Sequence, residues 1–321
     1  MRFLRLIIFC IIIVKANNQS YSQISASSHY TSYSTSQGMC DNTVTKIHQD
    51  TQGFIWIGTE NGLSWFDGHQ FITFKHKTND IHSIPHNRIF DICTDIEGDT
   101  WIATSNGLAK FNLFSHSFTR ITQENGYSQI PNNFVRHVYS DNQGNVWFSN
   151  SFAICKLSKK TKKIELYEVP KTRGTTSYPY IETMFYDRNN TLWLAIDEFL
   201  YTFNTKTHTF THISEYSTTS SNQLITAIQD DTKGNIWIGT NNGKILQYNK
   251  ENKKKIYHNL STRYKSSSVI SDIYEDSKGN LLISIQKIGI AYFKQGKLQL
   301  ISNPLFSFID NCDISCMIQD K

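Results

Sequence analysis

The sequence has 321 residues, a formal net charge of +5 and only 18% charged residues. It holds 20 Phe, 16 Tyr and 6 Trp, which is typical of an aromatic-rich all-β protein and not of a disordered chain. Nucleic-acid-binding domains are usually strongly basic, and this net charge is small, so we expect no nucleic-acid partner.

The first 16 residues have the build of a secretory signal peptide. Arg2 and Arg5 precede an apolar run from Leu6 to Val14, which is short for a membrane span. Ala16 supplies a small residue for cleavage. We therefore predict residues 1–16 as a signal peptide and a periplasmic location; the alternative is a retained N-terminal anchor.

Residues 17–43 form a lead-in that is rich in Ser, Thr and Tyr. Alternation of polar and apolar residues from Tyr21 to Ala26 indicates one strand ahead of the repeats.

One pattern recurs every 44 to 46 residues in the remainder, residues 44–321. It begins as Asp50-x-x-Gly53, with Trp56 six residues after the aspartate. Asp-x-x-Gly suits a four-residue turn, because Asp bonds the backbone two residues on and Gly tolerates a left-handed conformation. The further copies begin at Asp95, Asp141, Asp187, Asp231 and Asp276, and Asp320 falls at the next step.

Each repeat predicts four short antiparallel strands. In the first repeat these are residues 44–49, 54–59, 63–67 and 71–75, and the Asn61-Gly62 pair favours a tight hairpin. Both faces of such a sheet carry apolar or small residues, which fits sheets packed radially on one another. The sequence therefore predicts a β-propeller with four-stranded blades.

The period places six complete blades and the start of a seventh. The six blades are expected at about residues 44–75, 89–120, 135–167, 181–213, 225–257 and 270–300. The seventh is expected to begin with the strand-like residues 314–320, so the chain looks cut within a blade. The repeated tryptophans are predicted to pack between blades as scaffold, and not to stack on sugars.

The motif Asp-x-x-Gly-x-x-Trp-Ile-Gly-Thr-x-x-Gly-Leu, followed by Trp65-Phe66-Asp67-Gly68, resembles the two-component regulator propeller repeat. The resemblance implies the N-terminal periplasmic sensor part of a Bacteroidota hybrid two-component histidine kinase, a family thought to sense glycan fragments. It implies that the membrane connection lies in C-terminal segments that this sequence does not contain. We find no kinase motifs in the sequence.

Positions that depart from the repeat are the candidate binding residues. Trp65 and Tyr292 stand where the other blades carry Lys110, Lys156, Thr202 and Gln247, so exposed aromatic platforms are expected there. The loops that enter each first strand are expected to share one face with the Asn-Gly turns. From these loops we select Tyr127, Arg136, Tyr178 and Tyr180, because Tyr with Arg suits both saccharide and protein recognition.

We therefore expect a sensory propeller that binds an oligosaccharide or protein ligand, with a homodimer through the propeller as a further arrangement. The sequence predicts no cofactor, no metal site and no catalytic residues. Two alternatives stay open, a secreted propeller glycan hydrolase or lyase and a plain interaction scaffold. An enzyme of that kind needs paired carboxylates, or a His or Tyr base, on one face.

Overall fold

The computed structural model describes residues 9–11, 31–171, 179–213, 223–259, 268–294, 297–301 and 314–319. These residues form antiparallel strands and two short 3-10 helices, Thr35–Gln37 and Gln123–Asn125. No α-helix occurs in the described ranges, which confirms the all-β class. Nor does any helix in them have the length and apolar character needed to span a membrane.

Six sheets follow one another along the chain, and each consists of four consecutive antiparallel strands. Blades 1 to 3 comprise β3 (Val44–Gln49), β4 (Ile55–Thr59), β5 (Gly62–Phe66), β6 (Phe71–Phe74), β7 (Ile89–Thr94), β8 (Thr100–Thr104), β9 (Gly107–Asn112), β10 (Ser117–Ile121), β11 (Val138–Ser140), β12 (Val146–Asn150), β13 (Ala153–Leu157) and β14 (Ile164–Glu168). Blades 4 to 6 comprise β15 (Ile181–Tyr186), β16 (Thr191–Ile196), β17 (Phe199–Asn204), β18 (Thr209–His212), β19 (Ile225–Asp230), β20 (Asn235–Thr240), β21 (Lys244–Asn249), β22 (Lys255–Asn259), β23 (Ile270–Glu275), β24 (Leu281–Ile285), β25 (Gly289–Lys294) and β26 (Lys297–Leu300). These sheets confirm the predicted β-propeller and its six blades.

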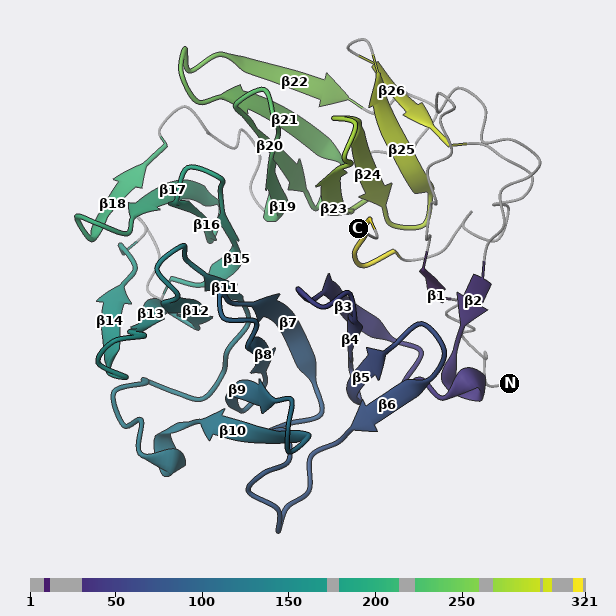
Figure 1. The fold of residues 1–321 in the computed structure, drawn as a ribbon. Helices are drawn as coiled ribbons and strands as arrows, with labels where there is room; N and C mark the ends of the chain where they lie inside the picture. The colour runs from purple at the N-terminus through teal and green to yellow at the C-terminus, as the bar shows by residue number, and fades with distance from the viewer. Residues whose placement is uncertain are drawn as a thin grey trace, which may run out of the picture. The chain divides into compact units, whose positions relative to one another are not determined.

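The chain divides into two compact units. Val44–Ile225 contains blades 1 to 4, and Thr226–Lys321 together with Met1–Thr43 contains blades 5 and 6. Within the first unit, the first strand of each blade lies on the inner side and the fourth strand on the outer side (Figure 1). Ahead of the blades, β1 (Phe9–Ile11) pairs with β2 (Thr31–Tyr33). The strand expected at residues 21–26 falls outside the described residues.

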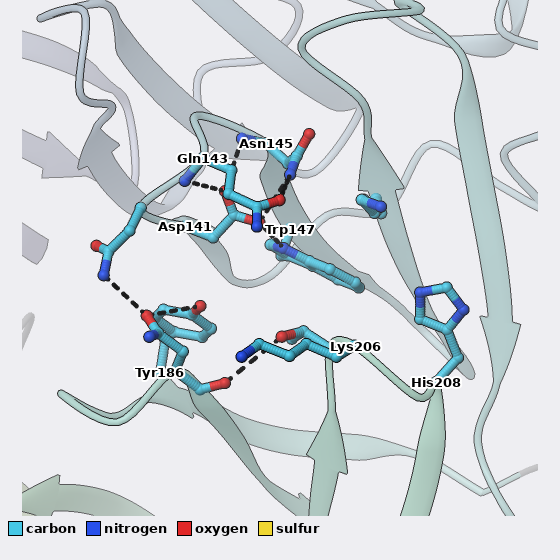
Figure 2. A pocket seen from close by; sticks show the side chains of 11 residues that line it. Asp141, Gln143, Asn145, Trp147, Tyr186, Lys206 and His208 are labelled. Carbon is cyan, nitrogen blue, oxygen red and sulfur yellow. Dashed lines mark hydrogen bonds between the residues drawn. The ribbon is translucent and has the colours of Figure 1, made fainter.

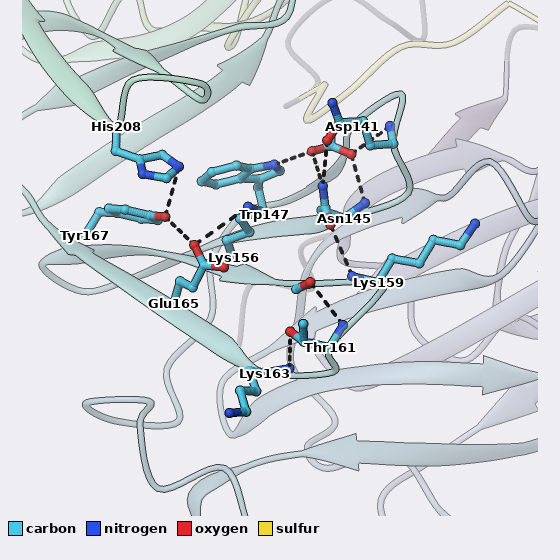
Figure 3. Close-up of polar contacts among 12 residues, drawn as sticks. Asp141, Asn145, Trp147, Lys156, Lys159, Thr161, Lys163, Glu165, Tyr167 and His208 are labelled. Atoms are coloured by element: carbon cyan, nitrogen blue, oxygen red, sulfur yellow. Dashed lines mark hydrogen bonds and ion pairs between the residues drawn. The ribbon is translucent and has the colours of Figure 1, made fainter.

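The repeated aspartate organises the turn between the first two strands and also reaches the core. In blade 3, Asp141 Oδ1 accepts hydrogen bonds from the backbone nitrogens of Gln143 and Asn145 at 2.9 and 2.8 Å. Its Oδ2 accepts the indole Nε1–H of Trp147 at 2.9 Å (Figure 3). Gly144 completes the turn with φ of 78°, a conformation that favours glycine. The turn chemistry predicted from Asp-x-x-Gly is thereby confirmed.

The repeated tryptophans are buried, and four of them, Trp56, Trp101, Trp147 and Trp237, pack between neighbouring blades as predicted. Trp56 of blade 1 is 1% exposed and meets the ring of Phe111 of blade 2 edge-on, with 4.8 Å between ring centroids. Trp147 of blade 3 meets Phe203 of blade 4 in the same way at 5.8 Å. Each of these two junctions is therefore an apolar layer centred on one indole ring.

An irregularity recurs in the innermost strands. The pairing register shifts between Val44 and Lys46, between Ile89 and Asp91, and at the matching places in blades 4 and 6. One residue at each bulge is left out of the ladder, and bulges commonly redirect a side chain. We call this place the bulge position; it lies five residues before the repeated aspartate.

The segment 314–319, where a seventh blade was expected to begin, lies against the first strand of blade 6. The Met317 backbone nitrogen donates to Asp272 Oδ2 at 2.7 Å, and Ser271 Oγ donates to the Ile314 carbonyl. Ile314 and Met317 also pack against Ile290. The segment has no strand pairing of its own, although it occupies the place that the repeat assigns to the next innermost strand.

Candidate functional site

The entry loops and the hairpin turns lie on one face of the first unit. The Gly62 backbone nitrogen, in the turn between the second and third strands of blade 1, donates to the Asn87 carbonyl at 2.7 Å. Asn133 Nδ2 donates to Asn106 Oδ1 at 3.1 Å across the next pair of blades. These bonds confirm the predicted grouping, and we call this surface the loop face.

Arg136 and Tyr180 meet on the loop face where blade 3 adjoins blade 4. Arg136 Nη1 donates to the Tyr180 hydroxyl oxygen at 3.1 Å, and the guanidinium carbon lies 5.6 Å from the centre of the Tyr180 ring. The same nitrogen is 3.7 Å from Glu182 Oε2. The Arg136 and Glu182 side chains are 37% and 23% exposed, so both remain accessible to a ligand.

Asp197 fixes the backbone of this group. Its Oδ1 accepts the Tyr180 backbone nitrogen at 2.9 Å, and its own backbone nitrogen donates to the Tyr180 carbonyl at 2.9 Å. Asp197 adopts a φ of 51° in the turn between β16 and β17, a conformation that Asp tolerates better than most residues. The reciprocal pair holds the entry loop of blade 4 against the hairpin turn of the same blade.

The electrostatics of the group centre on Glu182. Burial raises the pKa of this carboxyl above its ordinary value, the nearby Arg136 opposes that rise, and Asp197 adds to it. Two acidic side chains, one cation and one phenol therefore converge on a small area. Carboxylates accept hydrogen bonds from hydroxyl groups, and Arg and Tyr donate them, so the group matches a polyhydroxy ligand.

The shared repeat position explains why these side chains reach one another. Arg136 and Glu182 both occupy the bulge position, which in other blades also contacts the next repeat. Phe90 at this position packs on Phe134, with 5.1 Å between ring centroids, and Thr226 Oγ1 donates to the Ile270 carbonyl at 2.6 Å. At the junction of blades 3 and 4 the contact at this position is the charged pair of Arg136 and Glu182.

The expectation of an exposed platform at Trp65 is wrong, because the ring is 7% exposed. Trp65 pairs with Trp56 across β4 and β5 and stacks on it at 5.8 Å, with Phe111 at 6.2 Å. In blades 2 and 3 the position holds a lysine whose side chain lies over the indole. Lys156 Nζ, for example, lies 5.5 Å from the centre of the Trp147 ring. An aromatic in this position extends the core and not the surface.

Tyr127 and Tyr292 do not join Arg136 and Tyr180 in these contacts. Tyr127 is half-buried and packs against the core between blades 2 and 3. Tyr292 is half-buried on β25 and its hydroxyl donates to Gln299 on β26. Tyr178 lies outside the described residues. Sequence reasoning missed Glu182 and Asp197; the position of Glu182 in the repeat, matching that of Arg136, was the signal that would have identified it.

A family model described as "Two component regulator propeller" matches residues 38–61, 83–106, 129–152 and 219–242. Among curated proteins, a histidine kinase of Formosa agariphila is 33% identical over 76 residues, which cover 24% of this chain and 5% of the kinase.

Two solved structures share the fold. The extracellular domain of a putative hybrid two-component system of Bacteroides thetaiotaomicron is 18% identical with a TM-score of 0.68, and the match covers 85% of this chain and 37% of that one. An inactive variant of virginiamycin B lyase from Staphylococcus aureus, solved with quinupristin, is 14% identical with a TM-score of 0.63, covering 80% and 83%. The chain thus spans about 37% of the Bacteroides domain that it matches.

The fold and the matched repeats agree. Four of the six blades carry the matched segments over their first two strands and the loop that enters them. The chain therefore carries repeats of the two-component regulator propeller type in four of its six blades.

Proposed function

We propose that this chain is an extracytoplasmic sensory propeller of a two-component receptor, and that it binds an oligosaccharide on the loop face without changing it chemically. The contact group of Arg136, Tyr180, Glu182 and Asp197 is the observation that carries the proposal. The match to the two-component regulator propeller repeat, and the fold shared with an extracellular two-component domain, support a sensory role.

A saccharide suits this group better than an apolar ligand does. Arg136 and Glu182 keep 37% and 23% of their side chains exposed, and together they present donors and acceptors side by side. Tyr180 adds a flat ring whose hydroxyl is already oriented by Arg136. A ligand that replaces the long 3.7 Å contact between Arg136 and Glu182 with two shorter hydrogen bonds gains from groups that are partly desolvated.

The experiment is calorimetry of the chain against a panel of glycan fragments. Arg136→Ala and Tyr180→Ala are expected to weaken binding at least tenfold, about 1.4 kcal/mol. Arg88→Ala is the matched control, because Arg88 also lies on the loop face and pairs with a carboxylate, Glu60, at 2.8 Å. Unchanged affinity in both test variants would move the site elsewhere.

A hydrolase or lyase is the second candidate, because the structure brings together the carboxylates of Glu182 and Asp197, which sequence reasoning did not pair. The raised pKa of Glu182 is a property of general acids. The same glycan panel tests this activity. Release of product that is lost in Glu182→Gln would replace the sensory proposal with a catalytic one.

A further inference from the structure

A pocket of about 340 Å³ opens between blades 3 and 4 (Figure 2). It lies among the turns that join the first to the second strand and the third to the fourth strand. These turns are at the opposite ends of the strands from the loop face. Its lining is mostly polar and includes Asn142, Lys156, Tyr186, Asn190, Thr205 and Lys206.

The matching place between blades 5 and 6 is filled by a carboxylate of the chain itself. Glu275 stands one residue before the aspartate of blade 6, and Thr232 one residue after the aspartate of blade 5. Both Glu275 carboxylate oxygens accept the Thr232 backbone nitrogen at 3.0 Å, and Oε1 also accepts the Thr232 hydroxyl at 2.7 Å. At this junction the position is therefore held by a carboxylate, whereas Thr94 and Ser140 occupy it in blades 2 and 3.

Between blade 6 and the segment 314–319, the corresponding oxygen comes from a side-chain amide. Gln319 precedes Asp320 as Glu275 precedes Asp276, and Ser277 follows Asp276. Gln319 Oε1 accepts the Ser277 backbone nitrogen at 2.8 Å. In both places an oxygen from one repeat satisfies the backbone donor that the turn of the preceding repeat presents.

Blade 4 has no such oxygen, because Tyr186 takes the place of Glu275 and Gln319. The Tyr186 hydroxyl donates instead to Asn190 Oδ1 at 3.1 Å. Across the described part of the chain, the backbone nitrogen of Asn142, which corresponds to that of Thr232, has no hydrogen-bond partner, and Asn142 is exposed.

The neighbouring junction explains why the pocket stays open here. Between blades 2 and 3, Lys159 spans the matching space and pairs with Glu97 at 2.8 Å. Thr205 and Gln143 hold these two repeat positions at the junction of blades 3 and 4, and a threonine and an amide do not form that ion pair. The ion pair that fills the space between blades 2 and 3 is therefore replaced, between blades 3 and 4, by a shorter side chain and a neutral one.

The charge of the lining favours an anion. Asp141, the acidic residue of the lining, is already bonded to four donors, including Trp147 Nε1 and Asn145 Nδ2. Lys156 lies 3.7 Å from Glu165, which also accepts the Tyr167 hydroxyl (Figure 3). Lys206 is exposed, and its ammonium has no partner among the described residues.

We propose that this pocket binds a small hydroxylated carboxylate, of the size of a sugar acid. Its carboxylate takes the place that Glu275 fills in blade 6, against the Asn142 backbone nitrogen and the Lys206 ammonium. Asn142 Nδ2 already donates to Asn190 Oδ1 at 3.0 Å, so Asn142 Oδ1 accepts from the hydroxyl groups of the ligand and Asn190 Nδ2 donates to them. The volume is at the small end of ligand pockets, which favours a single ring or a short chain.

Calorimetry of the chain with glucuronate, gluconate, glucose and acetate tests the assignment. Glucuronate or gluconate is expected to bind at least tenfold more tightly than glucose, which lacks the carboxylate, and than acetate, which lacks the hydroxyl groups. Equal affinity for glucose would overturn the carboxylate assignment, and equal affinity for acetate would overturn the hydroxylated class. Absence of binding by both acids would overturn the site.

Two variants locate the site. Tyr186→Glu installs the carboxylate that blade 6 carries and is expected to weaken acid binding at least tenfold, while Lys206→Met is expected to weaken it at least fivefold. Lys160→Met is the matched control, because Lys160 holds the repeat position of Lys206 on blade 3 and lies outside the pocket lining. Acid binding that both variants leave unchanged would refute the proposal.

The loop-face variant Arg136→Ala separates this site from the proposed sensory one. Acid binding that survives in Arg136→Ala assigns the acid to the pocket. Loss of acid binding in Arg136→Ala, with no loss in Lys206→Met, would instead place the acid on the loop face and refute the pocket site.

Discussion

Asp95 Oδ2 accepts the indole Nε1–H of Trp101 at 2.9 Å, while Asp95 Oδ1 holds the turn that follows β7. The same side-chain bond, at 2.8 to 3.0 Å, recurs in the other blades that carry the tryptophan. In blade 6, where Leu282 replaces tryptophan, Asn280 Nδ2 donates to Asp276 Oδ2 at 2.9 Å. One carboxylate therefore joins the turn to the core in the five blades that carry the tryptophan, whereas in blade 6 both of its oxygens bond within the turn.

Asp95→Asn is expected to destabilise the protein by about 1.5–3 kcal/mol, the range for hydrogen bonds to charged groups. The amide preserves the size of the side chain, but one of its two terminal atoms becomes a donor and loses either the indole or the backbone partner. Chemical denaturation of the variant and the parent measures the difference. Asp99→Asn is the control, because Asp99 is partly exposed and pairs with Lys110 near the surface, where such pairs contribute about 0–1 kcal/mol. Equal losses in the two variants would contradict the bridging role of Asp95.

Trp101→Ala is expected to cost about 3–5 kcal/mol, the range for truncating a buried aromatic side chain. The ring is 7% exposed and packs in the cluster that blades 2 and 3 share. Thermal melts of the variant and the parent test this. Phe114→Ala provides the comparison, because Phe114 is fully exposed at the turn between β9 and β10. Coincident melts of Trp101→Ala and the parent would remove Trp101 from the core.

The period and the chemistry of its residues were sufficient to predict the blades. Asp50, Gly53 and Trp56 have unambiguous local roles, and their repetition left one way to cover both faces of each sheet. The bond from the aspartate to the tryptophan was not predicted. Spacing along the sequence does not show in which direction a side chain at the end of a turn will point.

Gly58→Ala is expected to cost about 1–3 kcal/mol through overpacking. A Cβ at Gly58 would lie 2.7 Å from Ile89 Cγ2 and 3.1 Å from Ile89 Cβ, on the first strand of the next blade. The Ile89→Ala background removes the nearer atom, so the glycine substitution should cost less there. A double-mutant cycle measures the coupling between the two sites. If the losses of unfolding free energy in the two single variants simply add, the Cβ introduced at position 58 and Ile89 do not clash.

Stability is expected to fall as the pH decreases from about 6.5 to about 4, in part through His137. Burial lowers the pKa of His137 from 6.5 to about 4, against the opposing effect of Asp91. Between these values the unfolded chain binds a proton that the folded chain does not, so the folded state loses stability as the pH falls. Denaturation of the parent and His137→Gln at several pH values checks this. The variant should show a weaker pH dependence in that window, and identical profiles would contradict it.

The candidate site was only partly predictable. Arg136 and Tyr180 were selected because both lie in entry loops and depart from the repeat, and the structure brings them within 3.1 Å. Trp65 departs from the repeat as well, but its neighbour across the hairpin is the core residue Trp56. A departure from the repeat does not distinguish these cases. The partner across the strand pair does, and strand register is only indirectly visible in a sequence.

The bulge position lets the junctions between blades differ in chemistry while the sheets stay alike. Phe90 makes one junction apolar, Arg136 makes another charged and Thr226 makes a third neutral and polar, while the turns and indole layers around them stay the same. A substitution at this position, matched by one in the next repeat, can therefore change the chemistry of a single junction and leave the sheets that carry it unchanged.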